Sequence, residues 1–302
     1  MTKGQWYSIA VILMVGSVGA FAQRFYSGTA NRGSVPDWTL EDAFKDDAFT
    51  FVRIEYDSYG RGGGYRGRSG GRRFGFNGQM DGGSGFRGRG FGRGGGFRGG
   101  GGCYTDWPDS DLNFSYRLHQ LTSMQVDPHG KVIRLTDPEL FHYPFIYIVE
   151  PGSLVFREEE VKALRQYLLN GGFLMVDDFW GEAEWYNFYR EIKRVFPDRE
   201  PVELDISHPI FHMVFDLKEK PQIPGIMAWF SSGVTYERDD AREVHYKALY
   251  DDQGRIMAII CHNTDLGDGW EEEATNPDYF HMFSEKYAYP LGINIVFYAM
   301  TH

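Results

Sequence analysis

A helix, a double glycine and a short apolar strand that ends in two aspartates follow one another between residues 158 and 178. The helix predicted over Glu158–Asn170 has apolar side chains at helical spacing, and Gly171 suits the left-handed residue that ends many helices. The strand predicted over Phe173–Val176 is wholly apolar, as in buried parallel sheets. Asp177 and Asp178 follow where that strand ends. This unit indicates an α/β fold.

The same alternation of strands and helices extends over the chain. Further strands are predicted at Phe49–Tyr56, Val132–Leu135, Phe145–Val149 and Ile256–Ile260. Further helices are predicted at Leu112–Met124, Glu184–Phe196 and Leu291–Met300. Alternating elements of these lengths predict a mainly parallel sheet that is covered by helices on both faces.

The first 22 residues have the pattern of an export signal. Lys3 precedes the apolar run Tyr7–Val18, and Ala20-Phe21-Ala22 is a small-x-small cleavage site. An uncleaved anchor is the alternative, but the run is shorter than the roughly 20 residues that span a bilayer. We therefore expect a protein exported to the bacterial periplasm or secreted, with no stable membrane span after signal removal.

Residues 60–102 divide the ordered chain. They are rich in glycine and hold nine arginines and one acid, a charge of +8, whereas the whole chain carries −11. Such a composition predicts disorder. It also resembles RNA-binding arginine-glycine segments, but export and the acidic remainder argue against nucleic acid. The segment is interpreted as a flexible insertion or as an arm for an anionic envelope polymer or a partner.

The insertion leaves one domain in two parts. Residues 23–59 hold an N-terminal segment and the first strand, and residues 103–302 hold the remainder. Two cysteines, Cys103 and Cys261, do not make a disulfide framework. They can form one bridge in an oxidising compartment or stay as separate thiols.

Acidic residues follow the predicted strands, at the edge where open α/β sheets bind ligands. Asp177 and Asp178 can hold a hard divalent cation or act as a general acid and base. Glu182 and Glu184 can join them or can cap the next helix. Glu150 follows the strand before, at the same edge.

A second polar loop follows the strand at Ile256–Ile260. It supplies His262, Asp265 and Asp268, which can complete a site if they meet Asp178, although this spacing also suits a plain turn. The candidate catalytic residues are thus Asp177, Asp178 and His262, and the candidate metal ligands are Asp177, Asp178 and Asp265.

Three further features have a functional and a structural interpretation. Arg117 can bind an anionic ligand or neutralise the nearby Asp109 and Asp111. Trp180 can stack on a sugar or belong to the core. His208 and His212 have the spacing of helical zinc ligands, but an Asp/Ser-His-Pro turn is favoured.

Several of these segments resemble a bacterial family known as domain of unknown function 4159. The resemblance is carried by Phe49–Asp57 and by Asp109–Phe114, Gly171–Trp185, Asn263–Trp270 and Tyr289–His302. It implies a flavodoxin-like three-layer sandwich, similar to class I glutamine amidotransferases. Larger relatives are associated with MoxR-type ATPase systems, which implies a possible class of protein partner.

The resemblance to amidotransferases does not extend to their chemistry. Glu150-Pro151-Gly152 stands in place of their first glycine loop, and the nucleophile position falls at about Asp178, where a carboxylate cannot form the thioester they need. We therefore expect an exported module that binds an envelope polymer, glycan or protein. The alternative is a carboxylate- or divalent-metal-dependent hydrolase that uses the strand-end aspartates.

Overall fold

The computed structural model describes Arg32, residues 35–44 and 47–59, and residues 102–302. The predicted export signal and nearly all of the glycine- and arginine-rich insertion lie outside these residues. Within the described part of the chain, no helix is both long and apolar enough to cross a membrane.

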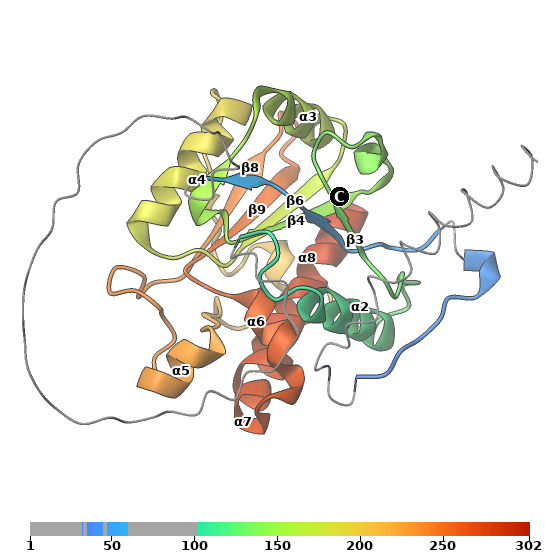
Figure 1. Cartoon of the computed structure of the whole chain (residues 1–302), viewed down its shortest axis with the longest axis vertical. Coiled ribbons are helices and arrows are strands. Elements are labelled where there is room, and N and C mark those ends of the chain that lie inside the picture. The colour runs from blue at the N-terminus through green and yellow to red at the C-terminus, as the bar shows by residue number, and fades with distance from the viewer. Residues whose placement is uncertain (1–31, 33–34, 45–46, 60–101) are drawn as a thin grey trace, which may run out of the picture.

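Seven strands form one sheet, which is parallel except at one edge (Figure 1). The parallel strands are, in spatial order, β3 (Lys131–Ile133), β1 (Val52–Ile54), β4 (Phe145–Val149), β6 (Phe173–Asp177) and β9 (Ile256–His262). The antiparallel strands β8 (His245–Tyr250) and β7 (Val202–Glu203) complete the edge beyond β9. Numbered along the chain, the parallel strands have the order 2-1-3-4-5, which is compatible with a flavodoxin-like fold.

Helices cover both faces of this sheet, as Figure 1 shows. One core cluster packs the sheet against α3 (Glu158–Leu169) and α4 (Gly181–Val195). The other packs it against α2 (Asp109–Leu121), α6 (Leu266–Glu271) and α8 (Tyr289–Thr301). Strands β4, β6 and β9 have every residue buried, because both faces are covered.

The remaining elements are short. They comprise the two-stranded sheet of β2 (Asp57–Ser58) and β5 (Leu154–Val155), the helices α5 (Ile226–Ser232) and α7 (Pro277–Tyr279), and the π-helical segment η6 (Phe280–Ala288). Single 3₁₀ turns occur at Asp42–Phe44, Pro138–His142, Pro151–Ser153, Pro209–Phe211 and Glu272–Ala274.

The predicted elements are confirmed, most of them with small shifts at their ends, but the strand predicted at Phe49–Tyr56 is shorter and covers only Val52–Ile54. The strand at Phe145–Val149 has the predicted bounds, whereas the helix predicted from Leu112 begins at Asp109. Strands β7 and β8 and helices α5 and α6 were not predicted. Cys103 and Cys261 are both free and buried.

Candidate functional site

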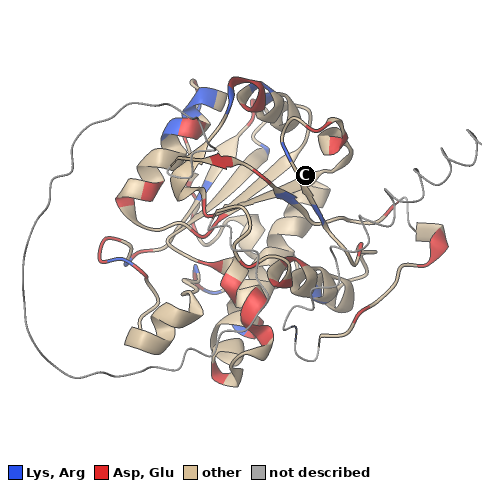
Figure 2. Cartoon of the chain, in the orientation of Figure 1, with Lys and Arg blue, Asp and Glu red and all other residues tan. Residues whose placement is uncertain are grey.

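The loops at the carboxyl ends of the parallel strands enclose a cavity of about 410 Å³. Seven acidic residues and one arginine, Arg238, line it. The acids are Asp106, Glu150, Asp178, Glu184, Glu237, Asp265 and Asp268. Figure 2 shows the concentration of acidic residues on α6 and the chain around it. The cavity is therefore a strongly negative site at the edge where the sequence predicted one.

The backbone around this cavity is unusual. Among the described residues other than glycine, four have a positive φ: Asp106 at 60°, Glu150 at 48°, Asp178 at 56° and Asn263 at 62°. The last three directly follow β4, β6 and β9, and the first lies in the loop before α2. Left-handed backbone at residues with a Cβ is uncommon and is concentrated at functional sites.

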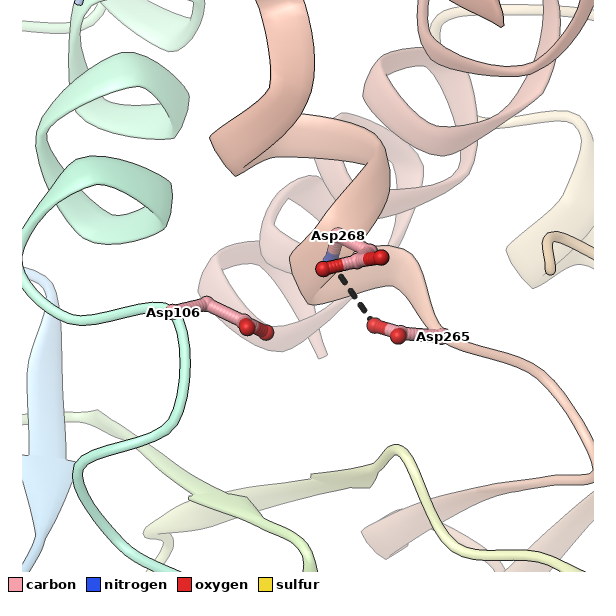
Figure 3. Close-up of side chains that lie close together, drawn as sticks. All are labelled: Asp106, Asp265 and Asp268. Atoms are coloured by element: carbon pink, nitrogen blue, oxygen red, sulfur yellow. Dashed lines mark hydrogen bonds between the residues drawn. The ribbon is translucent and has the colours of Figure 1, made fainter. Parts of the chain in front are cut away.

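Three carboxylates point toward one another in the cavity (Figure 3). One oxygen from each of Asp106, Asp265 and Asp268 can be chosen so that all three lie within 4.8 Å of one another. The side chain of Asp265 also caps the N-terminus of α6, because it accepts a hydrogen bond of 2.7 Å from the backbone N–H of Asp268. Asp106 Oδ2 is buried and has no hydrogen-bond partner among the described residues.

These acids share a raised proton affinity. Burial raises the pKa of Asp106 well above its usual value, and the charges of Asp268 and Glu271 raise it further. Burial and the charge of Asp178 act on Asp265 in the same direction. Burial, with the charge of Glu271, raises the pKa of Asp268 to about 7. Without a positive ligand, these groups therefore bind protons more tightly than exposed carboxyl groups do, and a cation that enters the cavity competes with those protons.

Asp177 does not line the cavity. It is fully buried, and its Oδ2 accepts hydrogen bonds from Tyr147 Oη at 3.1 Å, Leu266 N at 2.9 Å and Gly267 N at 3.1 Å. Burial still raises its pKa to about 7, although these hydrogen bonds act the other way. The side chain thus joins β6 to the start of α6, a role that differs from the catalytic and metal-ligating roles predicted for it.

Asp178, Glu150 and Trp180 do line the cavity. The indole of Trp180 donates a hydrogen bond of 2.9 Å to Asp178 Oδ1, and Glu150 accepts one from the backbone of Gly102. Burial and then the charge of Glu150 raise the pKa of Asp178 well above its usual value. These three predicted site residues are brought together.

The two glutamates in the first turn of α4 have different positions relative to the cavity. Glu184 lines the cavity, accepts a 2.8 Å hydrogen bond from the N–H of Trp180 at the start of α4, and pairs with Arg238. The predicted capping role is therefore confirmed for Glu184. The side chain of Glu182 is exposed and does not line the cavity.

His262 lies apart from the cavity, among aromatic rings. Its Nε2 lies 3.2 Å from the carbonyl oxygen of Gly181, and its ring lies against Phe179, Trp185 and His245. Burial lowers its pKa to about 4, so the ring is neutral at physiological pH. Its surroundings are those of a core histidine and do not match the predicted catalytic role.

His208 and His212 have structural roles, which is the interpretation that the sequence favoured. His208 Nδ1 accepts a hydrogen bond from Ile210 N and begins a 3₁₀ turn. His212 pairs with Asp216 and contacts the carbonyl oxygen of Ile206. The two imidazoles therefore have separate partners.

The prediction that Arg117 neutralises Asp109 and Asp111 is wrong. The guanidinium of Arg117 pairs with Glu273 instead. The carboxylate of Asp111 is bound by the buried Arg53 on the neighbouring strand β1. Arg117 lies two turns further along α2, beside the chain that follows α6. Because its guanidinium is engaged there, it is not part of the cavity.

Sequence reasoning did not identify Asp106 and Glu237 as site residues. Asp106 follows no predicted strand, and Glu237 lies in a loop without periodicity. The one available signal was the run Thr105–Asp111, in which three acids stand close together. That run becomes informative only once the fold brings it to the strand ends.

A second hollow, of about 470 Å³, lies beside β7 and is lined by residues 203–206, 219 and 220. Each of its three acids already has a partner: Glu203 pairs with Lys220 and Lys247, Asp205 accepts hydrogen bonds from Ser207, and Glu219 accepts one from Tyr287. This hollow lacks the convergent, unpaired carboxylates of the strand-end cavity, which is the better candidate site.

Comparisons with known proteins agree with the resemblance seen in the sequence. No curated protein matches the chain at a significant level. Residues 95–300, about two thirds of the chain, match the family described as a domain of unknown function (DUF4159). The chain, with its mainly parallel sheet and acidic strand-end cavity, therefore belongs to the DUF4159 family.

Proposed function

We propose that the cavity binds a hard divalent cation through Asp106, Asp265 and Asp268, and that the domain uses this ion to hold a polar ligand. The observation that carries the proposal is the convergence of three carboxylate oxygens within 4.8 Å of one another, together with the buried oxygen of Asp106 that has no partner among the described residues.

The geometry suits such an ion. Two oxygens on opposite sides of a Ca²⁺ ion lie roughly 4.8 Å apart, because each Ca²⁺–oxygen distance is about 2.4 Å. Ca²⁺ takes about 6 to 8 oxygens, so three carboxylates leave positions for water or for an oxygen-rich ligand. The cavity, at about 410 Å³, has room for that ligand beside the ion.

The surrounding fold supports a binding module that derives from an amidotransferase-like sandwich. Asp178 stands between a buried strand and a helix with φ at 56°, as a nucleophile does on a strand–turn–helix elbow. A carboxylate there cannot replace the thiol in amide transfer. With the predicted export signal, these features favour an envelope module whose ligand is a polymer, a glycan or a protein partner, including a MoxR-type system.

Titration of the purified, metal-free chain with Ca²⁺ and Mg²⁺ by calorimetry tests the proposal. We expect one ion per chain, and at least about a tenfold loss of affinity in Asp106→Asn, because a ligand is removed. Asp239→Asn removes a fully exposed carboxylate outside the cavity and should leave the affinity unchanged. Equal affinities in Asp106→Asn and the unaltered chain would contradict the proposal.

Hydrolysis is a second candidate function, favoured by the elbow position of Asp178. A neighbouring cation would lower the pKa of this carboxyl group and would allow it to act as a base or a nucleophile. Cation-dependent cleavage of p-nitrophenyl phosphate or acetate, abolished in Asp178→Asn with ion binding retained, would support this function. Absence of turnover with both ions and both substrates would favour the binding module.

A further inference from the structure

Arg53 is a buried arginine on the sheet strand that lies between β3 and β4. It belongs to β1, is 0% exposed and stands beside Tyr147 of β4. Its guanidinium lies 5.2 Å from the centre of the Tyr147 ring. A buried cation is costly unless its donors are satisfied, so its partners are informative.

Its partners all lie on the segment that carries Asp106. Nε donates to Asp111 Oδ2 at 3.0 Å, and Nη2 donates to Ser110 Oγ at 2.9 Å and to Asp111 Oδ1. Nη1 donates to the carbonyl oxygens of Cys103 at 3.2 Å and Thr105 at 2.7 Å. All three guanidinium nitrogens are therefore used on residues 103–111.

Asp106 lies between these anchor points. Thr105, which Arg53 binds, directly precedes Asp106. The carbonyl oxygen of Asp106 accepts a 2.9 Å hydrogen bond from Ser110 N. Its φ of 60° is unfavourable for aspartate and requires support from neighbouring structure. Anchoring on both sides supplies that support.

The charge of Arg53 also acts on the site. It lowers the pKa of Asp106 and that of Glu271, against the effect of burial and of the other acids.

We infer that Arg53 is a positioning residue for the cation site, which holds the 103–111 segment so that Asp106 faces Asp265 and Asp268. This inference rests on the proposed function. Lysine cannot replace arginine here, because an ammonium group lacks the planar fork that binds a carboxylate and two carbonyl oxygens together.

The test is Ca²⁺ titration of the full chain carrying Arg53→Lys. Residues that orient metal ligands typically contribute about 10- to 100-fold in affinity, so we expect about a tenfold loss. Arg134→Lys is a matched control, since Arg134 pairs with Glu55 and Asp57 outside the cavity. Its affinity should equal that of the unaltered chain.

A double-variant comparison separates positioning from a general structural effect. If Arg53 acts through Asp106, adding Arg53→Lys to Asp106→Asn should cause no further loss of affinity. A tenfold loss in both backgrounds would overturn the inference, and so would unchanged affinity in folded Arg53→Lys. A chain that binds no ion even when unaltered would overturn the proposed function and this inference with it.

If Arg53→Lys does not fold, a milder variant tests the same inference. Ser110→Ala removes one hydrogen-bond acceptor of the guanidinium and keeps its pairing with Asp111. We expect a loss of about threefold in Ca²⁺ affinity, consistent with one neutral partner lost. Affinity equal to that of the unaltered chain would overturn the inference.

Discussion

Two adjacent aspartates at the end of β6 have different roles. Asp177 is fully buried and accepts hydrogen bonds from Tyr147 and from the first turn of α6, whereas Asp178 lines the cavity. Successive side chains of a strand point to opposite sides, so neighbours at a strand end enter different surroundings. The sequence placed both at the site edge but did not distinguish the two roles.

Alanine substitution at Asp177 and at Asp178 should distinguish their two roles. Asp177→Ala leaves Tyr147 Oη and the N–H groups of Leu266 and Gly267 without an acceptor, so we expect a loss of about 3 kcal/mol in unfolding free energy. Asp178→Ala removes an acid surrounded by other acids, and should cost less than about 1 kcal/mol. Urea unfolding of the metal-free chains measures both, and equal losses would contradict the bracing role of Asp177.

The raised pKa values predict how stability depends on pH. Asp177, Asp268 and Glu271 have pKa values of about 7 in the folded chain, well above those of unfolded carboxyl groups. The folded chain therefore binds more protons than the unfolded chain between about pH 4 and 7. Stability from these groups is present below that range and is lost as the pH rises through it.

Thermal melts with EDTA and with Ca²⁺ measure this effect. Bound Ca²⁺ compensates the carboxylate charges of the cavity, and it competes with protons less as the pH rises. The ion should therefore raise the melting temperature more at pH 8 than at pH 5. An equal or smaller increase at pH 8 would contradict the shared titration of the cavity acids.

At the scale of elements, α6 is the unpredicted helix that carries the site residue Asp268. Its six residues, Leu266–Glu271, include two glycines, which have low helix propensity, and the segment was interpreted as a loop. Tertiary contacts overcome this propensity, because Asp265 caps the helix and Asp177 accepts its first N–H groups. Strand β8 was also missed, although its burial partly alternates.

Gly267 of α6 gives an element-scale prediction. A Cβ at this position would lie 2.5 Å from Asp106 Oδ2 and 3.2 Å from Tyr147 Oη. Gly267→Ala should therefore displace the Asp106 carboxylate and lower Ca²⁺ affinity about tenfold, even though alanine favours a helix. Calorimetric titration measures the change.

Gly292→Ala is the control for that variant. Its Cβ would meet Phe114 and Trp270 in the core at 2.6 and 2.7 Å, so it should lower stability by about 1 to 3 kcal/mol. It should leave the Ca²⁺ affinity of the folded chain unchanged. Equal affinities in Gly267→Ala and Gly292→Ala would show that glycine at 267 is not needed for the site.

At the scale of the whole molecule, both ends of the described chain that border the basic insertion lie at the acidic cavity. The N–H of Tyr59 donates to the carbonyl oxygen of Ser153, and that of Gly102 donates to Glu150. Ser153 and Glu150 both line the acidic cavity. The two described residues that border the insertion, Tyr59 and Gly102, therefore both contact the cavity wall.

Replacing the nine arginines of the insertion by glutamine keeps its length and removes its positive charge. Tethered positive charge lowers the local concentration of cations, so Ca²⁺ affinity should rise a few-fold at low salt. The difference should fall as ionic strength approaches about 1 M, where the screening length is about 3 Å. Unchanged affinity at low salt would mean that the insertion does not act on the cavity.

The sequence by itself determined the alternation of strands and helices and the acidic edge of the sheet. Apolar periodicity is local, and parallel connections bring strand ends to one edge whatever the details of packing. Glu150, Asp178, Asp265 and Asp268 could therefore be placed near one another without coordinates.

The tertiary structure alone decided which acids face one another. Asp106 precedes the strand ends of Asp178 and Asp265 by more than 70 residues and reaches them because Arg53 holds its segment. His262, close to Asp265 in sequence, is instead buried among aromatic rings. The convergence of distant side chains depends on packing between elements, which no local pattern records.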